Sequence, residues 1–356
     1  MTGLHVVDVL VVGLGPAGSR AAAEVARLGC TVLAVDRRKQ AGDPVQCAEF
    51  VPAMISQSVA GLTSSCRQTI GSMVTYVETE DPDVKGDFNG HIIDRAAFDR
   101  ELVRSARGLG ADCRFAAPIA RLTDGAAMLS DGQRVEARVM IGADGPRSLV
   151  GKSIGRVNTE LVETRQITVP LHHAHEATDI YLSARIPGGY GWLFPKGRVA
   201  NVGVGVMRQV RRDLKPLLDE LHTDLVAKGR VGSTVLQRTG GAIPVSGLLD
   251  VVGRSGDTPV LLAGDAAGLT NPVTGAGINA AVISGALAGR AAAEHVVGRP
   301  DALADYREEV TETFGPGLRR ALRRRRQLLD CLESPITVSP GALRRGWIAY
   351  PTYWAA

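Results

Sequence analysis

A glycine-rich turn between an apolar segment and an alanine-rich segment is the feature that most constrains the fold of this chain. The turn, Gly13-Leu14-Gly15-Pro16-Ala17-Gly18, follows the apolar residues 6–12 and leads into residues 17–28, whose composition favours a helix. A second apolar stretch, residues 31–35, ends at Asp36. The order of strand, glycine turn, helix and strand is that of the βαβ unit that binds nucleotides.

The residue types in this unit suit a pyrophosphate. Gly13 permits the tight turn, Gly15 lets backbone N–H groups come close to the phosphates, and Gly18 lets the helix pack against the sheet. An acidic residue at the end of the second strand can accept hydrogen bonds from a ribose. We therefore expect these cofactor contacts in the unit: Gly13, Gly15, Ala17, Gly18, Asp36 and Arg37.

Two further tracts extend the nucleotide site. Gly142-Ala143-Asp144-Gly145 follows a strand-like segment, and so does Gly264-Asp265-Ala266-Ala267-Gly268. The latter leads into Gly275-Ala276-Gly277-Ile278-Asn279, where a helix of small residues begins and runs to about residue 297. One glycine fingerprint alone is weak evidence. Three tracts in this order and at these spacings predict a flavoprotein that binds FAD.

With these tracts the chain resembles the flavoprotein hydroxylase fold, the p-hydroxybenzoate hydroxylase-like group of aromatic hydroxylases, flavin halogenases and geranylgeranyl reductases. The resemblance implies that Asp265 binds the ribityl chain and that Asp144 lies near the pyrophosphate. It also implies that the helix opened by Gly275, Gly277 and Ile278 directs its N–H dipole at the N1–C2=O edge of the flavin. Gly264 would complete the cofactor contacts of this tract.

The segment Tyr190-Gly191-Trp192-Leu193-Phe194-Pro195-Lys196 resembles the Y/F-x-W-x-F-P-K segment of the geranylgeranyl reductase family. On a strand, Tyr190, Trp192 and Phe194 lie on one face. They would form an aromatic wall that, with Pro272, suits a flat or isoprenoid substrate. The alternative is that these rings belong to the core. Flavin halogenases carry a related W-x-W-x-I-P segment, which differs from this one at Tyr190 and Phe194.

Two other segments resemble elements that lie beside the cofactor. Residues 44–49, Pro-Val-Gln-Cys-Ala-Glu, resemble the P-x-x-C-A/G-E/D loop of the same reductases, so Cys47 and Ala48 are expected to contact the flavin. Cys47 would donate a proton to a substrate carbon or tune the flavin, and Glu49 would set its protonation. The alternative for Cys47 is a small buried hydrophobe. Arg95 would be directed at the FAD phosphates, and its alternative is an exposed arginine at a helix start.

Composition excludes other classes of protein. A chain of 356 residues with 45% hydrophobic content can bury one large core or two closely packed domains. A net charge of +4 and only 4% aromatic residues argue against a nucleic-acid partner. Five cysteines without repeated spacing argue against a disulfide framework and a zinc knuckle. With neither a signal peptide nor a membrane span recognisable, we expect a cytoplasmic protein.

The spacing of the tracts predicts an α/β fold with a discontinuous domain organisation. The Rossmann-like FAD-binding domain would comprise residues 1–75, 92–155 and 256–300, and a β-rich substrate domain would comprise residues 76–91 and 156–255. Residues 301–356 would form a helical C-terminal segment. Within the substrate domain we expect strands at 166–171, 180–186, 191–194, 199–207 and 234–238, and a helix at 214–226.

Two clusters of charged or metal-ligating residues have less specific patterns. His172, His173, His175 and Glu176 include only two histidines on one strand face, which indicates a solvated strand end rather than a metal site. Arginines at 319, 320 and 323–326 are interleaved with leucines, as in a basic amphipathic helix. Such a helix is either a solvated face or a surface that docks on an anionic membrane at its inner face.

The resemblance implies an FAD-dependent oxidoreductase that reduces C=C bonds of an isoprenoid or other hydrophobic substrate by hydride transfer from flavin N5. Electrons would come from NAD(P)H or another reductant. Only about sixty residues follow the FAD helix, which favours a smaller or protein-bound substrate over a long lipid. Two alternatives remain. One is a monooxygenase that hydroxylates an aromatic or amino-acid side chain, with a partner protein as one such substrate, and the other is a flavin-binding membrane-surface protein without turnover.

Overall fold

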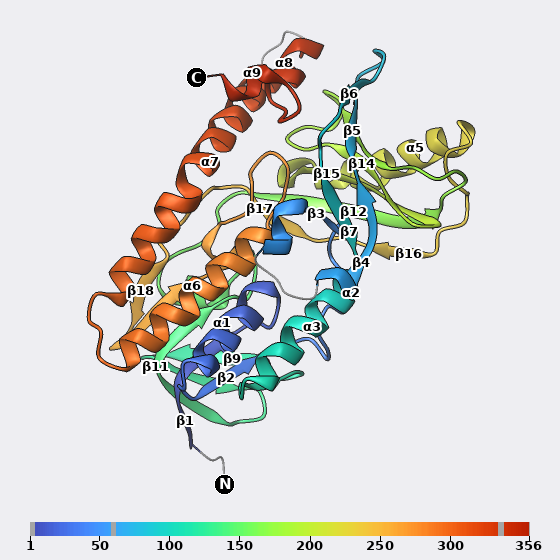
Figure 1. The fold of residues 1–356 in the computed structure, drawn as a ribbon. Coiled ribbons are helices and arrows are strands. Elements are labelled where there is room, and N and C mark those ends of the chain that lie inside the picture. Colours follow the sequence, from blue (N-terminus) through green and yellow to red (C-terminus); the bar gives the residue numbers. More distant parts are fainter. Residues whose placement is uncertain (1–3, 58–61, 334–337, 356) are drawn as a thin grey trace.

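The computed structural model describes residues 4–57, 62–333 and 338–355, which form two large sheets, one small sheet and a helical C-terminal segment (Figure 1). The strands are β1 (Leu4–Val12), β2 (Val32–Val35), β3 (Phe50–Pro52), β4 (Cys66–Ile70), β5 (Ser72–Val77), β6 (Asp83–Lys85), β7 (Gly90–Ile93), β8 (Asp112–Arg114), β9 (Ile119–Thr123), β10 (Ala126–Leu129), β11 (Arg134–Gly142), β12 (Leu161–Pro170), β13 (Ala177–Leu182), β14 (Gly191–Lys196), β15 (Val199–Met207), β16 (Gln237–Thr239), β17 (Ala242–Pro244), β18 (Val252–Ser255) and β19 (Thr258–Leu262). The α-helices are α1 (Pro16–Arg27), α2 (Leu62–Ser65), α3 (Arg95–Gly108), α4 (Leu149–Ser153), α5 (Leu214–Ala227), α6 (Ile278–Val296), α7 (Ala302–Glu333), α8 (Pro340–Arg345) and α9 (Pro351–Trp354).

The first sheet has the strand order β18-β19-β11-β1-β2-β8, with β10 and β9 added to β11. Strand β1 pairs in parallel with β2 and β11, and β11 pairs in parallel with β19. The carboxyl-terminal halves of its central strands are buried because apolar side chains, such as Val9, Leu10 and Val11, lie on both faces. Parallel strands bring their carboxyl ends to one edge, so the three glycine-rich tracts meet there.

Helices α1, α3 and α6 form a layer over this sheet (Figure 1). Helices α1 and α6 lie unusually close, since a Cβ on Gly285 would be 2.1 Å from the carbonyl oxygen of Ala17. The first turns of both helices flank Gly264, where a Cβ would be 3.0 Å from Ala17 Cβ and 3.3 Å from Ala281 Cβ. Small side chains therefore hold the two helix N-termini next to each other at the sheet edge.

The second sheet has the order β16-β12-β15-β14-β13-β5-β6, with β17 also paired to β12. All its pairs are antiparallel except β5 with β13. One face packs on α5 through residues such as Leu193 and Leu218, and the other carries Trp192 and Phe194. The small sheet β3-β7-β4 contacts both β14 and α6, so it joins the two large sheets.

The C-terminal helices connect the two halves of the molecule. Helix α7 starts beside α6 and runs along the molecule to the second sheet, where α8 and α9 lie (Figure 1). Helix α8 packs on β5. Within the described ranges, no helix is long and apolar enough to cross a membrane.

The mixed α/β fold with a helical C-terminus is as predicted, and the elements differ from expectation mainly at their ends. Strand β13 stops at Leu182 instead of reaching residue 186, because the chain turns directly after it, where the Ile186 N–H donates to the carbonyl oxygen of Ser183 at 3.0 Å. The strand expected at 234–238 lies at Gln237–Thr239, where it pairs with β12. Strand β5 already belongs to the second sheet at Ser72, so the boundary expected at residue 75 falls inside that strand.

Candidate functional site

Two helices begin at the carboxyl edge of the first sheet without a side-chain cap. Gly15 is the N-cap of α1 and Gly277 is the N-cap of α6, and neither helix receives a side-chain hydrogen bond at its start. By contrast, the Asp94 carboxylate caps α3 by accepting from the Ala97 N–H. Uncapped N–H groups and the positive end of the helix dipole suit the negative groups of a dinucleotide.

The glycines of the first two tracts are of two kinds. At some of them a side chain would collide with the backbone, and at others the adjoining space is open. A Cβ on Gly13 would be 2.3 Å from the carbonyl oxygen of Ala143, and one on Gly18 would be 1.7 Å from that of Gly13. A Cβ on Gly15 would meet only the Arg38 guanidinium, at 3.7 Å, and one on Gly145 would meet no atom within 4 Å. The tight packing fixes the turn, while the open positions border the uncapped α1 terminus. These residues therefore fit the pyrophosphate of FAD.

Asp36 lies at the end of β2 as expected and supports the glycine turn. Its buried carboxylate accepts hydrogen bonds from the backbone N–H groups of Leu14 and Arg38, both at 2.8 Å. The Arg38 side chain also pairs with it and approaches Gly15, whereas Arg37 is exposed. Of these two arginines, both of which the sequence offers as cofactor contacts, Arg38 thus faces the glycine turn.

The two aspartates of the later tracts have different surroundings. Asp144 anchors the start of α4, since its carboxylate accepts from Ser148 Oγ at 2.5 Å and from the Leu149 N–H at 2.6 Å. Asp265 accepts from Thr270 Oγ1 at 2.8 Å and lies beside the α6 terminus, where a Cβ on Gly277 would be 3.2 Å from its Oδ1. Burial raises the pKa of both carboxyls. Asp265 therefore has a carboxylate next to α6 that hydroxyl donors would stabilise.

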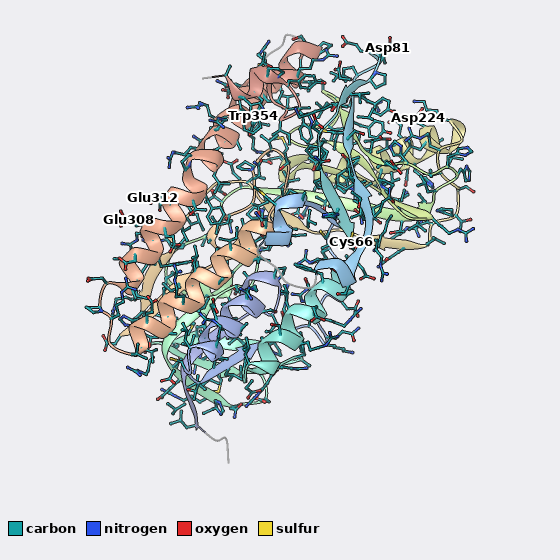
Figure 2. The ribbon with its side chains drawn as sticks, in the orientation of Figure 1. Cys66, Asp81, Asp224, Glu308, Glu312 and Trp354 are labelled. Atoms are coloured by element: carbon teal, nitrogen blue, oxygen red, sulfur yellow. The ribbon has the colours of Figure 1, made fainter. Side chains whose placement is uncertain are left out.

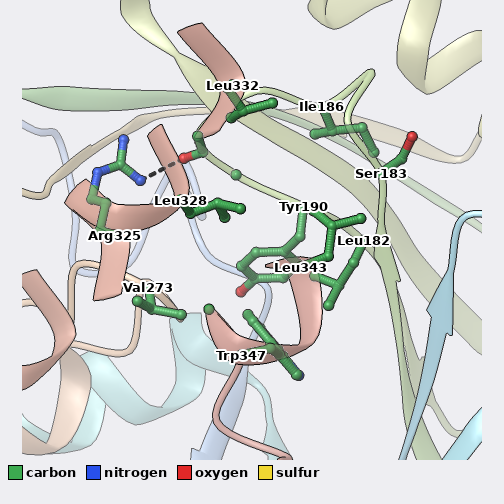
Figure 3. Close-up of a pocket in the computed structure, with 13 residues that line it drawn as sticks. Leu182, Ser183, Ile186, Tyr190, Val273, Arg325, Leu328, Leu332, Leu343 and Trp347 are labelled. Carbon is green, nitrogen blue, oxygen red and sulfur yellow. Dashed lines mark hydrogen bonds between the residues drawn. The ribbon is translucent and has the colours of Figure 1, made fainter. Parts of the chain in front are cut away.

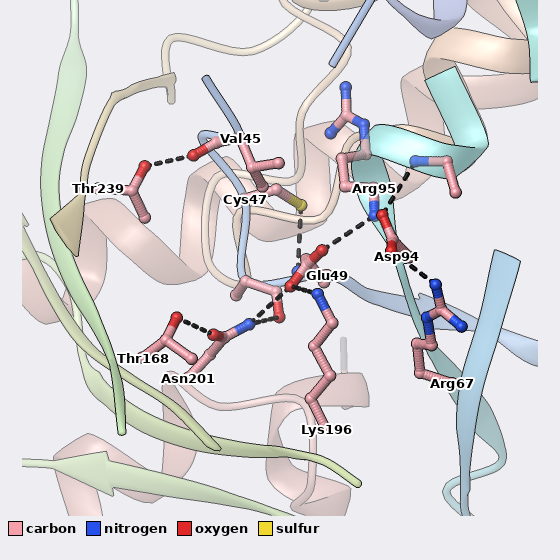
Figure 4. Close-up of polar contacts among 12 residues, drawn as sticks. Val45, Cys47, Glu49, Arg67, Asp94, Arg95, Thr168, Lys196, Asn201 and Thr239 are labelled. Atoms are coloured by element: carbon pink, nitrogen blue, oxygen red, sulfur yellow. Dashed lines mark hydrogen bonds and ion pairs between the residues drawn. The ribbon is translucent and has the colours of Figure 1, made fainter. Parts of the chain in front are cut away.

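The loop that contains Cys47 is tied to the second sheet by polar side chains (Figure 4). Gln166 Nε2 donates to the carbonyl oxygen of Cys47 at 3.1 Å, and the Thr239 hydroxyl donates to that of Val45. Asn201 Nδ2 contacts the carbonyl oxygen of Ala48 at 3.4 Å. These contacts come from β12, β15 and β16, so the second sheet fixes the position of the loop.

Glu49 is a buried junction within this loop. Its carboxylate accepts from the Arg95 N–H at 2.9 Å, from Asn201 Nδ2 at 2.9 Å and from Lys196 Nζ at 2.7 Å. The residue has φ +73°, and its own N–H donates to Cys47 Sγ at 3.1 Å. The structure thus places Glu49 beside Cys47 through its backbone, with its carboxylate engaged by three other donors.

The Cys47 thiol lies next to the Arg95 side chain. Burial raises the pKa of the Cys47 thiol, and the Arg95 guanidinium opposes this increase. Arg95 Nε donates to Asp99 Oδ1 at 2.7 Å, and its charge also acts on Asp265. Arg95 is therefore a partly buried cation between the Cys47 loop and the aspartate beside α6, not an exposed residue at a helix start.

Trp192 and Phe194 of β14 lie on one face of the strand, and Tyr190, which directly precedes the strand, packs in the same cluster as expected. Trp192 and Phe194 are each 6% exposed and belong to an aromatic cluster, with the Trp192 ring lying against the β15 backbone at Gly203. Trp192 Nε1 donates to Gln166 Oε1 at 3.1 Å. Tyr190 is half-buried, and its hydroxyl donates to the carbonyl oxygen of Thr274 at 2.6 Å. Tyr190 thus links this wall to the segment that precedes α6.

Tyr190 also lines an apolar pocket that the C-terminal helices enclose (Figure 3). The rings of Tyr190 and Trp347 meet edge to face, with their centroids 4.8 Å apart. Val273 contributes from the segment before α6, and Leu328 and Leu343 contribute from α7 and α8. The residues after α6 therefore help to line an apolar space. The sequence signal that could have found them is the apolar content of residues 338–350.

The remaining candidate clusters have structural partners. His175 Nε2 lies 2.7 Å from Asp179 Oδ1, and Asp179 also pairs with Arg230 at 2.7 Å. In the part of the chain that the structure describes, no group of three or more potential metal ligands occurs. Of the basic run on α7, Arg319, Arg323 and Arg326 are exposed. Arg325 is 7% exposed, so the run is not wholly a solvated face.

Comparison with known proteins agrees with this arrangement. The family described as geranylgeranyl reductase catalytic domain matches residues 162–243. A digeranylgeranylglycerophospholipid reductase of Methanocella arvoryzae is 32% identical over 95% of this chain and 91% of its own length. A second reductase of that name, from Methanosarcina acetivorans, is 34% identical over 86% of this chain and 79% of its own length.

Solved structures show the same fold. A geranylgeranyl bacteriochlorophyll reductase-like protein of Thermoplasma acidophilum superposes with a TM-score of 0.81 and 26% identity, covering 99% of this chain and 98% of that one. PqsL of Pseudomonas aeruginosa, described as a probable FAD-dependent monooxygenase, has a TM-score of 0.71 at 19% identity over 95% of this chain and 98% of that one, which shows a shared fold alone. The chain therefore belongs to the geranylgeranyl reductase family and is an FAD-dependent oxidoreductase.

Proposed function

We propose that this enzyme reduces C=C bonds in the prenyl chain of an amphiphilic substrate. The observation that carries the proposal is the position of the partly buried Cys47 thiol, which lies beside the Arg95 guanidinium and close to Tyr190 of the aromatic wall. FAD, when bound in its reduced form, supplies a hydride from N5. The cofactor-binding residues would be those at the starts of α1 and α6, together with Asp36, Asp144 and Asp265.

Cys47 is the proton donor in this proposal. Because burial raises the pKa of its thiol, Cys47 remains protonated at neutral pH. One carbon of the double bond accepts the hydride and the other accepts the Cys47 proton, which leaves a saturated bond and a thiolate. Arg95 stabilises that thiolate by its adjacent positive charge, and solvent returns the proton. NAD(P)H or another reductant then restores the reduced cofactor.

Glu49 acts as a positioning residue. Its carboxylate fixes the Cys47 loop against Lys196 and Asn201, and it holds the first N–H of α3 at Arg95. Tyr190 and the residues around it bind the apolar chain. Trp192 packs against Tyr190, and Phe194 packs against Trp192 in turn, so both rings hold Tyr190 in position. This division gives the family segment of β14 one contact residue and two supporting residues.

The outer face of α7 would place the enzyme on an anionic membrane surface. Glu308 and Glu312 lie in the first half of the helix, far from Trp354, which lies near its other end (Figure 2). The second half carries exposed Arg319, Arg323 and Arg326, and Arg320 of the same half lies over the ring of Trp354, which is 55% exposed. Clustered arginines with an exposed tryptophan favour a lipid headgroup layer. Binding to vesicles should need anionic lipid and should weaken in an Arg323→Glu/Arg326→Glu variant, whereas equal binding to neutral vesicles would contradict this contact.

Product analysis tests the function itself. The protein, loaded with FAD and reduced by dithionite without oxygen, is incubated with prenyl acceptors, and the products are analysed by mass spectrometry. We expect products that gain two hydrogen atoms per reduced bond. An unchanged acceptor without oxygen, together with an oxygenated product once O2 is admitted, would contradict the reductase and support a monooxygenase.

A further inference from the structure

The apolar pocket beneath α7 contains a buried guanidinium. Arg325 projects from α7 at one side of the ring of apolar side chains (Figure 3) and is only 7% exposed. Its Nη1 donates to the carbonyl oxygen of Gly188 at 2.5 Å and lies 3.4 Å from that of Pro272. Its Nε is buried without a hydrogen-bond partner. The acceptors that Nη1 of this cation contacts are thus neutral carbonyl groups.

Two partly buried arginines of this protein are neutralised by carboxylates. Arg95 pairs with Asp99 at 2.7 Å, and Arg230 pairs with Asp179 at the same distance. Among the side chains that the structure describes, which exclude those of residues 56–63 and 333–337, no carboxylate forms an ion pair with the Arg325 guanidinium. Burial lowers the pKa of Arg325, and the charge of Glu160 offsets this only in part. A buried charge without a counter-charge is costly, so its retention here indicates a negative partner from outside the chain.

The other side chains that line the pocket are mostly apolar. Its walls include Leu182, Ile186, Val273, Leu328, Leu332 and Leu343. The Tyr190 hydroxyl, which could have offered another polar contact, already donates to the carbonyl oxygen of Thr274. A pocket with apolar walls and one cationic group orients a ligand by its charged end.

We propose that Arg325 binds an oxyanion, phosphate or carboxylate, attached to the prenyl substrate, and that it selects anionic prenyl amphiphiles over neutral ones. The inference rests on the proposed function, because it takes the prenyl chain as the occupant of the pocket. A guanidinium suits this task since it presents N–H groups in a planar fork that matches two oxygens of a phosphate or carboxylate. Arg325 is thereby a specificity-determining residue with no part in hydride or proton transfer.

Binding of three matched ligands tests the proposal. Farnesyl phosphate, farnesoic acid and farnesol share one chain and differ in the head group, and calorimetry on the oxidised holoenzyme measures their affinities without turnover. We expect at least one anion to bind about 10- to 100-fold more tightly than farnesol, as a charge-assisted hydrogen bond provides. The anion that binds more tightly identifies whether the group is a phosphate or a carboxylate.

Arg325→Met should abolish this preference while leaving farnesol affinity within about twofold, as only the oxyanion contact is lost. Arg326→Met is the matched control, because it removes the same charge from the exposed neighbouring position and should keep the preference. If Arg325→Met does not fold, Arg325→Lys provides the test: a retained charge with fewer donors should give an intermediate preference. Equal affinity of the wild type for all three ligands, or full preference in Arg325→Met or Arg325→Lys, would overturn the assignment.

The outcome is separable from that of the proposed function. Reduction of farnesol by the wild type without any anion preference would refute the role of Arg325 and leave the reductase intact. Conversely, Arg325-dependent anion binding without reduction of any ligand would support the oxyanion site and refute the reductase.

Discussion

Cys47 and Glu49 stand two residues apart in one loop and have different surroundings. The thiol is partly buried beside Arg95, while the Glu49 carboxylate is occupied by Lys196, Asn201 and the Arg95 N–H. The first arrangement leaves a proton available for transfer. The second arrangement engages the Glu49 carboxylate with three donors and so fixes the loop.

The role of Cys47 as a proton donor predicts a specific pH dependence of anaerobic flavin reoxidation. Its thiol has a pKa raised above the ordinary value of 9.0, so the protonated form persists through neutral pH and is lost only above that value. The rate should therefore be constant from about pH 6.5 to pH 9 and should fall at higher pH. Cys47→Ala should be slower by about 100-fold or more and should lack the alkaline decline, whereas Cys113→Ala, a buried thiol in the first sheet, should match the wild type. An alkaline decline that persists in Cys47→Ala would assign the proton to another group.

The ion pair of Glu49 with Lys196 predicts a coupled effect on stability. Glu49→Gln should lower the free energy of unfolding by about 2 kcal/mol, because it leaves the partly buried Lys196 ammonium without its counter-charge. Glu49→Gln/Lys196→Met should recover part of this loss, since the uncompensated charge is removed as well. Urea denaturation of Glu49→Gln, Lys196→Met and the double variant measures the coupling. Simple additivity of Glu49→Gln and Lys196→Met would mean that the pair contributes nothing specific.

At the scale of elements, the uncapped start of α1 can be tested without disturbing its packing. A side chain at Gly15 would enter the open space beside the turn, and the residue has a φ of −79° that any amino acid adopts. Gly15→Val should therefore leave the melting temperature of the apo protein near that of the wild type but weaken FAD binding by about 100-fold or more, through loss of the phosphate contacts. Gly71→Val, at an exposed position with equally open space, should bind FAD normally. Full FAD content in Gly15→Val would place the phosphates elsewhere.

Two C-terminal tryptophans distinguish the inner and outer faces of the C-terminal helices. Trp347 is 3% exposed and packs on Tyr190, whereas Trp354 is 55% exposed. Trp347→Ala should weaken binding of a prenyl acceptor about tenfold or more at unchanged FAD content, because a pocket wall is removed. Trp354→Ala should not change the affinity for a short, soluble acceptor. Equal effects of the two substitutions would argue that the pocket near Trp347 does not hold the chain.

At the scale of the whole molecule, the local sequence was sufficient to predict features that one short segment forms by itself. The glycine turn of α1, the start of α6 and the alternation of Tyr190, Trp192 and Phe194 were all predictable, since each follows from local periodicity or from backbone space. The tie between the Cys47 loop and Gln166 was not, because it joins residues more than a hundred positions apart.

The burial of Arg325 could have been predicted from its helical spacing, although the run of arginines around it suggests an exposed residue. Arg325 lies seven positions after Leu318 and seven before Leu332, which places all three on one helix face. That face is the one that packs inward, as the burial of Leu318 and Arg325 shows. The closure of the pocket by α8 was not predictable, since it depends on how far α7 extends along the molecule.

The central claim is that the reduced enzyme passes its electrons to a prenyl double bond. The most direct measurement is the flavin absorbance of the photoreduced enzyme, mixed without oxygen with a prenyl acceptor or with its fully saturated analogue. The acceptor should restore the oxidised flavin spectrum and yield one saturated bond per flavin, and the analogue should leave the flavin reduced. A flavin that stays reduced with every prenyl acceptor, yet is oxidised by O2 with formation of an oxygenated product, would contradict the account.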